Sequence, residues 1–272
     1  MHVDHYLARI GVTGPIKPDL ESLRKLHRGH LLSISYENFD VQFGRPVTID
    51  IPAIYAKIVE CRRGGWCYEM NGILGWALKE LGFEVTRATG AVMRETGGDA
   101  TAGNHLVLKV ELDEGIHLAD VGFGDGPIEP FAITPGGFRS NGFAFEVGRV
   151  DENWWRLRNH PEGGAPSFDF NLAPANEALL AAQCHRLQTQ PESIFVQTAL
   201  CFRHTASGLS ILRGRVLREV TPQAVSERIL NDAGEFRDAI EDIFALDIPD
   251  AASLWPQIRA RHDALFRQRE KA

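Results

Sequence analysis

Apolar residues recur at helical spacing in the first third of the chain. A period of three to four residues predicts an amphipathic α-helix, and two segments, residues 18–32 and 67–81, follow it. The apolar positions are Leu20, Leu23, Leu26 and Leu31 in the first segment and Met70, Leu74, Leu78 and Leu81 in the second. Gly82 suits the C-terminal cap of the second helix. A shorter helix is expected at residues 54–61, and the polar and aromatic residues 35–40 indicate a loop.

From residue 85 to residue 204 the pattern changes to short strands separated by turn residues. The expected strands are 85–93, 105–112, 116–121, 143–147, 154–158 and 201–204. Short strands with frequent glycine and proline turns are typical of a small antiparallel barrel or sandwich.

The remaining residues predict a third and smaller α/β unit. Strands are expected at 209–212 and 216–220, followed by a helix that Thr221 caps with Pro222 in its first position. A last helix is expected at 251–267, interrupted by Pro256. The chain is therefore divided into a helical unit at 1–85, a β unit at 86–204 and an α/β unit at 205–272.

Composition narrows the possible functions. The chain has 272 residues, of which 44% are hydrophobic and 24% charged, which is typical of a globular protein with a sizeable core. The net charge of −7 gives no electrostatic case for a nucleic-acid partner. No apolar run approaches the roughly 18 residues of a membrane span, and the first residues do not resemble a signal peptide. The four cysteines form no C-x-x-C pair, so we expect reduced thiols in a cytoplasmic protein and no metal site.

Cys67 is the candidate nucleophile. It follows Gly64 and Gly65 and begins the second predicted helix. The N-terminus of a helix carries partial positive charge, which is expected to lower the pKa of a thiol and increase its reactivity. The alternative is that Cys67 is only a small buried hydrophobic residue.

A histidine and a carboxylate are expected to lie together on one hairpin. His105 begins the strand 105–112 and Asp120 lies near the end of the returning strand. If the loop has two residues, Asp113-Glu114 or Glu114-Gly115, then His105 and Asp120 share a face. In the first of these registers they are diagonal neighbours, within side-chain reach. With Cys67 they would form a nucleophile, a base and a residue that orients the base.

These residues also resemble a known family. The sequence R-G-G-W-C-Y-E-M-N at 63–71, followed by His105 and by D-V-G-F-G at 120–124, resembles the arylamine N-acetyltransferases. Residues 35–39 are similar to the family's P-F-E-N segment, with Ser-Tyr in place of Pro-Phe. The resemblance implies an α+β fold with an N-terminal helical bundle, an antiparallel β-barrel and a C-terminal α/β lid, built around a thiol-protease-like Cys-His-Asp core.

The resemblance also implies a reaction. Cys67 would be the acetylated nucleophile, His105 the base and acid, and Asp120 the orienter. Acetyl-CoA would be a co-substrate rather than a bound cofactor. An arylamine or arylhydrazine would then remove the acetyl group from the cysteine, which predicts ping-pong kinetics.

Other residues receive roles in substrate binding and support. By resemblance, Asn71 would support the aspartate, Phe123 would lie near the arylamine, and coenzyme A would approach at Gly103-Asn104. Arg63 is expected to brace the glycine loop by pairing with a carboxylate such as Glu69, which is assigned to structure rather than chemistry. Two interpretations are open for three arginines, a solvated strand face or contact with the phosphates of coenzyme A: Arg213, Arg215 and Arg218.

Alternative functions follow from the same residues. A thiol hydrolase or transglutaminase-like enzyme uses the same triad, and an amide synthase that closes a macrolactam shares the family resemblance. A binding module with the same fold is the non-enzymatic alternative. The oligomeric state and the preferred amine are not determined by the sequence.

Overall fold

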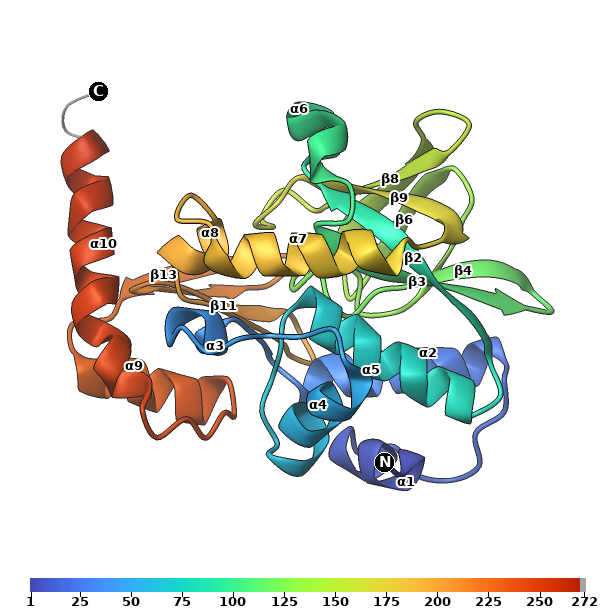
Figure 1. Ribbon diagram of the computed structural model, residues 1–272, viewed down its shortest axis with the longest axis horizontal. Coiled ribbons are helices and arrows are strands. Elements are labelled where there is room, and N and C mark those ends of the chain that lie inside the picture. The colour runs from blue at the N-terminus through green and yellow to red at the C-terminus, as the bar shows by residue number, and fades with distance from the viewer. Residues whose placement is uncertain (270–272) are drawn as a thin grey trace.

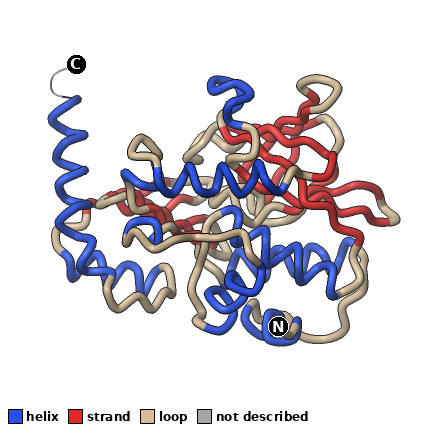
Figure 2. The backbone as a smooth tube through the Cα atoms, viewed as in Figure 1, coloured by secondary structure: helices blue, strands red, loops and turns tan. Residues whose placement is uncertain are grey.

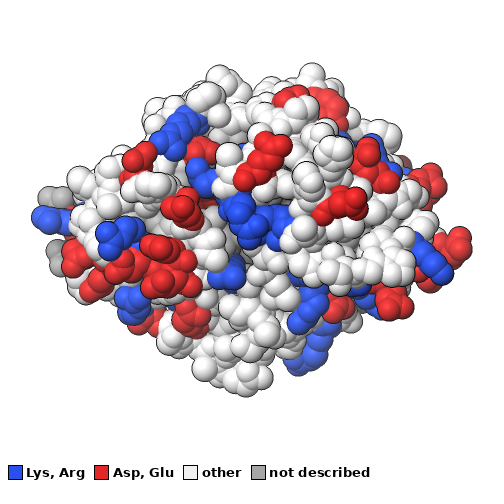
Figure 3. Space-filling model, turned by 90° about the horizontal axis from the view of Figure 1, so that it is seen from below, with Lys and Arg blue, Asp and Glu red and all other residues white. Residues whose placement is uncertain are grey.

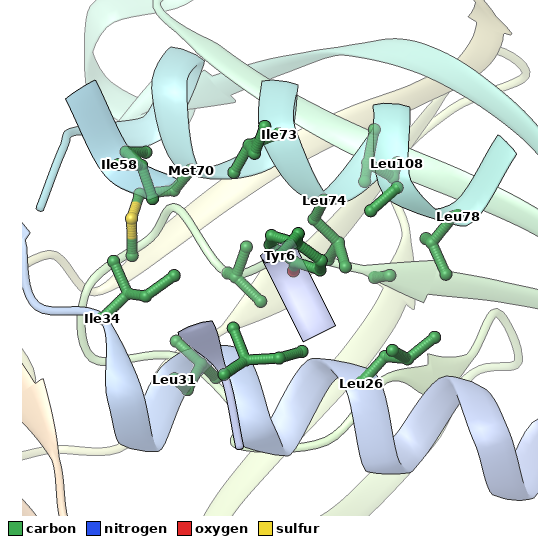
Figure 4. Close-up of a cluster of buried hydrophobic side chains, with 14 of the residues drawn as sticks. Tyr6, Leu26, Leu31, Ile34, Ile58, Met70, Ile73, Leu74, Leu78 and Leu108 are labelled. Carbon is green, nitrogen blue, oxygen red and sulfur yellow. The ribbon is translucent and has the colours of Figure 1, made fainter. Parts of the chain in front are cut away.

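The N-terminal part of the chain is a group of helices packed around one apolar core. The computed structural model describes residues 1–269 and begins with α1 (Val3–Arg9), α2 (Leu20–Ser33), α4 (Ile51–Tyr55) and α5 (Cys67–Glu80). A π-helical turn at Ala56–Glu60 continues α4. The apolar stripes of α2 and α5 face each other across this core (Figure 4). Gly82 adopts a φ of +88° just after α5, which confirms the predicted cap.

The segment 35–40, expected to be a loop, contains regular structure instead. Tyr36–Glu37 forms the short strand β1 and Phe39–Gln42 the short helix α3. Strand β1 pairs with a strand more than 160 residues later in the sequence, Tyr36 opposite Phe202 and Glu37 opposite Cys201. The loop prediction was wrong because this pairing partner is remote in sequence.

An eight-stranded antiparallel sheet forms the middle of the chain. Its strands are β2 (Glu84–Val92), β3 (His105–Leu112), β4 (Gly115–Ala119), β5 (Phe131–Ala132), β6 (Gly136–Ser140), β7 (Phe143–Arg149), β8 (Trp154–Arg158) and β9 (Ser167–Pro174), in the order β5-β4-β3-β2-β9-β8-β7-β6. The sheet curls into a half-barrel (Figure 2), and Phe131 and Phe138 from its two edge strands stack with ring centroids 5.3 Å apart. The expected mixed α+β fold with antiparallel sheets is confirmed, and the barrel is open at these edges.

A second antiparallel sheet contains five strands. Its order is β1-β10-β11-β12-β13, with β10 at Leu200–His204, β11 at Leu209–Arg213, β12 at Val216–Val220 and β13 at Val225–Ile229. The prediction of a helix directly after Thr221 is wrong. Thr221 instead closes a β-hairpin, in which its N–H donates to the carbonyl of Ala224 at 2.8 Å. Helices appear only afterwards, as α9 (Ala233–Asp238) and α10 (Trp255–Arg269). Pro256 lies in the first turn of α10, where no helical N–H bond is lost, and so does not interrupt it.

Helix α7 (Glu177–Thr189) runs across the molecule in front of the two sheets (Figure 1). Together with the short helix α8 (Ile194–Gln197), it occupies a region in which only strands were expected. Its buried residues Leu180 and Cys184 pack in one cluster with Cys67 and Tyr68 at the start of α5. Another short helix, α6 (Arg94–Gly97), follows β2.

The surface mixes charges of both signs. Basic side chains gather near the centre of the face seen in Figure 3, with acidic side chains on either side of them. Across residues 1–269, none of the helices combines the length and the apolar character required to cross a bilayer.

Candidate active site

Cys67 is the first residue of α5 and is held by a tightly packed loop. A Cβ atom at Gly65 would lie 2.8 Å from Cβ of Glu69, so the chain can turn into the helix here only with glycine. The Cys67 side chain is almost fully buried, with 3% of the residue exposed. It nevertheless lines a cavity of about 1130 Å³.

The pKa of the Cys67 thiol is raised, not lowered as its helix position had suggested. Burial is the largest cause, and nearby Cys184 and Asp120 add to it, while the backbone N–H groups of Leu106 and Tyr68 act in the opposite direction. The N–H group at the start of the helix therefore does favour the thiolate, but the predicted net lowering of the thiol pKa is wrong. A buried neutral thiol needs a base beside it before it can act as a nucleophile.

His105 lies on the wall of the same cavity and is paired with Asp120. The hairpin has the two-residue loop Asp113-Glu114, because Leu112 pairs with Gly115, and this is the first of the two expected registers. The distance from His105 Nε2 to Asp120 Oδ2 is 2.8 Å. An ionised carboxylate can only accept, so Nε2 carries the proton and Nδ1 is left as the basic nitrogen.

The backbone of the neighbouring strand fixes the imidazole ring. A Cβ atom at Gly90 would lie 2.8 Å from Cδ2 of His105, so β2 approaches the Cδ2 edge of the ring as only glycine allows. Nδ1 is on the opposite edge. Phe168 and Phe123 pack against the ring with centroids 5.2 Å and 6.0 Å away.

Asp120 is buried and its two oxygens are both satisfied. Besides the bond to His105, its Oδ1 accepts from Asn71 Nδ2 at 2.7 Å and from the Gly122 N–H at 2.8 Å. Burial alone would raise the pKa of Asp120, but His105, Asn71 and Gly122 together lower it below the usual value. The carboxylate therefore stays ionised next to the imidazole.

Asn71 and His27 hold the strand end that carries Asp120. Asn71 Nδ2 also donates to the carbonyl of Leu106 at 2.6 Å, and its Oδ1 accepts from the Val121 N–H at 2.9 Å. The Asp120 N–H donates to His27 Nε2 at 3.1 Å. The amide of Asn71 thus joins α5 to both strands of the hairpin, which agrees with the supporting position expected for it.

The residues expected to contact substrates differ in their placement. Phe123 and Asn104 line the cavity with Cys67, and the carbonyl oxygen of Asn104 lies 3.9 Å from the sulfur. Gly103 lies behind the cavity wall, where its carbonyl accepts from the Tyr68 hydroxyl at 2.7 Å. The structure thus places Asn104, but not Gly103, at the surface that a substrate can reach.

Arg63 braces the glycine loop through carboxylates other than the one expected. Its Nη2 lies 2.7 Å from Glu37 Oε1 and 3.3 Å from Asp40 Oδ1. Glu69 pairs instead with Lys57, at 2.9 Å, and accepts from the Trp66 N–H at the start of α5. Arg63 therefore pairs with carboxylates, but Glu69, the carboxylate named as an example, is not one of them.

The cavity has a second group of lining residues that sequence reasoning missed. Tyr36, Asp125 and Phe202 lie with Cys67 and His105 around it. Tyr36 belongs to the P-F-E-N-like segment, which was a signal for this position, whereas no pattern marked Asp125 or Phe202. The cavity then extends along the five-stranded sheet to Arg213, Arg215 and Arg218 and to α10. Across residues 1–269, no group of three or more His, Cys, Asp or Glu side chains is placed to hold a metal ion.

Comparison with known proteins identifies the family of this chain. A family model described as N-acetyltransferase matches residues 19–253. The pineal gland isozyme NAT-3 of the arylamine N-acetyltransferases of Gallus gallus is 34% identical, over 81% of this chain and 83% of its own. The chain belongs to the arylamine N-acetyltransferase family. The predicted family and enzyme class, an acetyltransferase, are thereby confirmed.

Further arylamine N-acetyltransferases agree over most of their length. The one from Mycolicibacterium smegmatis is 33% identical over 95% of this chain and 97% of its own. A solved M. smegmatis arylamine N-acetyltransferase superposes with a TM-score of 0.86 at 32% identity, covering 95% of this chain and 97% of that one. The Mycobacterium marinum enzyme, solved in complex with CoA, superposes with a TM-score of 0.85 at 29% identity, covering 96% of this chain and 98% of that one.

Proposed function

We propose that the protein transfers an acetyl group from acetyl-CoA to the nitrogen of an arylamine or arylhydrazine through an acetyl-Cys67 intermediate. The observation that carries the proposal is the meeting of Cys67 and an Asp120-paired His105 in one cavity. In a chain of this family, these three residues would supply the nucleophile, the base and the orienter that acyl transfer requires.

In the first half-reaction His105 Nδ1 takes the thiol proton of Cys67. The thiolate attacks the thioester carbonyl of acetyl-CoA, the bond from that carbon to the CoA sulfur breaks, and the imidazolium returns its proton to the leaving thiolate. Backbone N–H groups at the start of α5, such as that of Tyr68, would stabilise the oxyanion. Asp120 keeps Nε2 protonated and stabilises the transient imidazolium charge.

In the second half-reaction the amine nitrogen attacks the acetyl-cysteine. A C–N bond forms, the C–S bond to Cys67 breaks, and His105 accepts the proton that the amine loses. One site serves both substrates in turn, so CoA must leave before the amine reacts, which is the basis of ping-pong kinetics.

The cavity supports acetyl-CoA as the donor. It is long enough to extend from Cys67 to β11 and β12, and a relative of this chain has been solved with CoA. Arg215 lies 3.8 Å from Asp263 and Arg218 lies 3.1 Å from Glu162. No ion pair of Arg213 with a carboxylate occurs within residues 1–269, and its side chain is exposed. We therefore favour Arg213 as the arginine that meets a CoA phosphate.

Intact mass spectrometry tests the proposal directly. Mixing the protein with acetyl-CoA and no amine should add one acetyl group, a gain of about 42 Da, which an aromatic amine then removes. Cys67→Ala should show no gain, whereas the matched variants Cys61→Ser and Cys184→Ser should keep it. Intact acetyl-CoA with no adduct would refute the proposal, and CoA release without a lasting adduct would indicate a hydrolase.

A further inference from the structure

Tyr36 is a buried residue of the cavity wall. The chain has four tyrosines, and the hydroxyls of Tyr6, Tyr55 and Tyr68 each hydrogen-bond within the protein. Tyr36 is only 7% exposed, yet no hydrogen bond joins its hydroxyl to another group among residues 1–265, whose side chains the structure describes. Its side chain lines the cavity, so the partner of this hydroxyl must come from the cavity itself.

The position of this hydroxyl is fixed by the fold. The Tyr36 ring packs edge-on against Phe202 with centroids 5.5 Å apart, and the two residues are direct partners in the β1–β10 pairing. On its other side β1 forms a bridge to Gly65 in the loop that precedes Cys67. A hydroxyl held between two backbone segments loses little entropy when it binds a ligand.

Tyr36 stays protonated and can both donate and accept. Burial raises the pKa of its hydroxyl well above the usual value, and the nearby Cys67 and Asp125 add to this effect. The group is therefore neutral at any pH at which the enzyme would work.

Asp125 supplies an acceptor at the same end of the cavity. It is 2% exposed and lines the cavity; its Oδ1 accepts from Asn159 at 3.0 Å and its Oδ2 accepts from the Gly164 N–H. These two bonds leave acceptor directions on the carboxylate unused. Gly164 lies against the Phe202 ring, a Cβ there being 4.0 Å from Cε1, so Phe202 borders both Tyr36 and the Asp125 loop.

We infer that Tyr36, together with Asp125, selects acceptor amines whose aromatic ring carries a hydroxyl group. A ring hydroxyl can accept from Tyr36 and donate to Asp125, whereas a ring carboxylate would face the negative charge of Asp125. An alkyl group neither donates nor accepts a hydrogen bond, so it gains nothing from the Tyr36 hydroxyl. This inference rests on the proposed acetyl transfer and specifies its acceptor.

The test compares Tyr36→Phe with the wild-type enzyme on paired amines. The variant removes one oxygen atom and keeps the ring that packs on Phe202, and it restores the residue usual in the family's P-F-E-N segment. The substrates are 3- and 4-aminophenol, with 3- and 4-methylaniline as controls of similar shape. We expect kcat/KM for the better aminophenol to fall about fivefold, the effect of one neutral hydrogen bond, with the methylanilines changing less than about twofold.

The acetylation half-reaction separates this inference from the proposed function. Acetyl-Cys67 formation, followed by mass in the absence of amine, should proceed at the same rate in Tyr36→Phe and in the wild type. An equal fall in kcat/KM for all four amines, or no fall for any of them, would refute the selection of hydroxylated rings. Slower acetylation in the variant would also refute it and would place Tyr36 at the reacting sulfur. If the wild type forms no acetyl-enzyme, the proposed function itself fails.

Discussion

Asp120→Asn should inactivate the enzyme by changing which nitrogen of His105 holds the proton. Asp120 Oδ1 accepts two N–H groups, from Asn71 and Gly122. An asparagine at this position must place its carbonyl oxygen there, so its NH₂ group faces His105 Nε2. Two donors cannot face each other, so Nε2 must become the acceptor and the imidazole proton must move to Nδ1. Nδ1 is then unable to take the proton of Cys67.

The size of the effect follows from this exchange of tautomers. All the hydrogen bonds of residue 120 can be remade in the variant, so its stability should fall by no more than about 1–2 kcal/mol. The equivalent change in serine proteases lowers the rate about 10⁴-fold, which corresponds to about 5 kcal/mol in the activation free energy. We expect a loss of that order in the rate of acetyl-Cys67 formation, measured by rapid quenching and intact mass.

Nuclear magnetic resonance of the imidazole nitrogens tests the cause independently of the rate. In ¹⁵N-histidine-labelled protein, His105 should be protonated at Nε2 in the wild type and at Nδ1 in Asp120→Asn, with a His105→Gln sample to assign its signals. Acetylation within about tenfold of the wild-type rate would contradict the orienting role of Asp120. An unchanged tautomer of His105 combined with a large loss of rate would refute the move of the imidazole proton as the cause of inactivation.

Three further predictions concern the same cavity. Gly122→Ala should destabilise the protein by about 1–3 kcal/mol, because its Cβ would lie 2.7 Å from the backbone Cα atom of Cys67; urea unfolding measures this, and Gly148→Ala, with open space around it, should be neutral. In His105→Ala, alkylation of Cys67 by iodoacetamide should still accelerate above the usual thiol pKa of about 8.5, because burial raises the pKa of that thiol; a plateau below pH 8.5 would contradict this. Arg213→Glu should raise the KM for acetyl-CoA about tenfold and leave that for the amine unchanged, and equal effects on both would remove Arg213 from the CoA site.

The part of the site that sequence could predict is the part built by local geometry. His105 and Asp120 are joined by one hairpin, so the parity of their positions and a two-residue loop were enough to bring them together. The helix that begins at Cys67 was likewise evident from its apolar period and from Gly82. Each of these inferences depends on residues fewer than about 20 positions apart, where the chain leaves few alternatives.

Remote pairings were not predictable in this way. Arg63 was expected to pair with a carboxylate such as Glu69, which is near it in sequence, but it binds Glu37 and Asp40, which β1 and α3 bring to it. The strand that carries Glu37, β1, pairs with β10, whose residues are more than 160 positions later in the sequence. Helix α7 was missed for a related reason: only Leu180 and Cys184 are buried along its 13 residues, so its apolar stripe is short.

The pKa of Cys67 depends both on a local feature, the helix N-terminus, and on burial by residues remote in sequence. Burial of this cysteine is compatible with acyl transfer. The helix N-terminus, a local feature, favours the thiolate, but burial outweighs it and raises the pKa. The same burial limits access of water to an acetyl group on the sulfur, while Phe123 and Phe202 in the cavity wall offer an apolar surface to an aromatic ring. A neutral arylamine can therefore enter where bulk water is restricted, and its nitrogen competes with water for the thioester on favourable terms. A raised thiol pKa that would be a disadvantage for a solvent-exposed nucleophile is thus compatible with selective acyl transfer, provided that His105 removes the proton at each turnover.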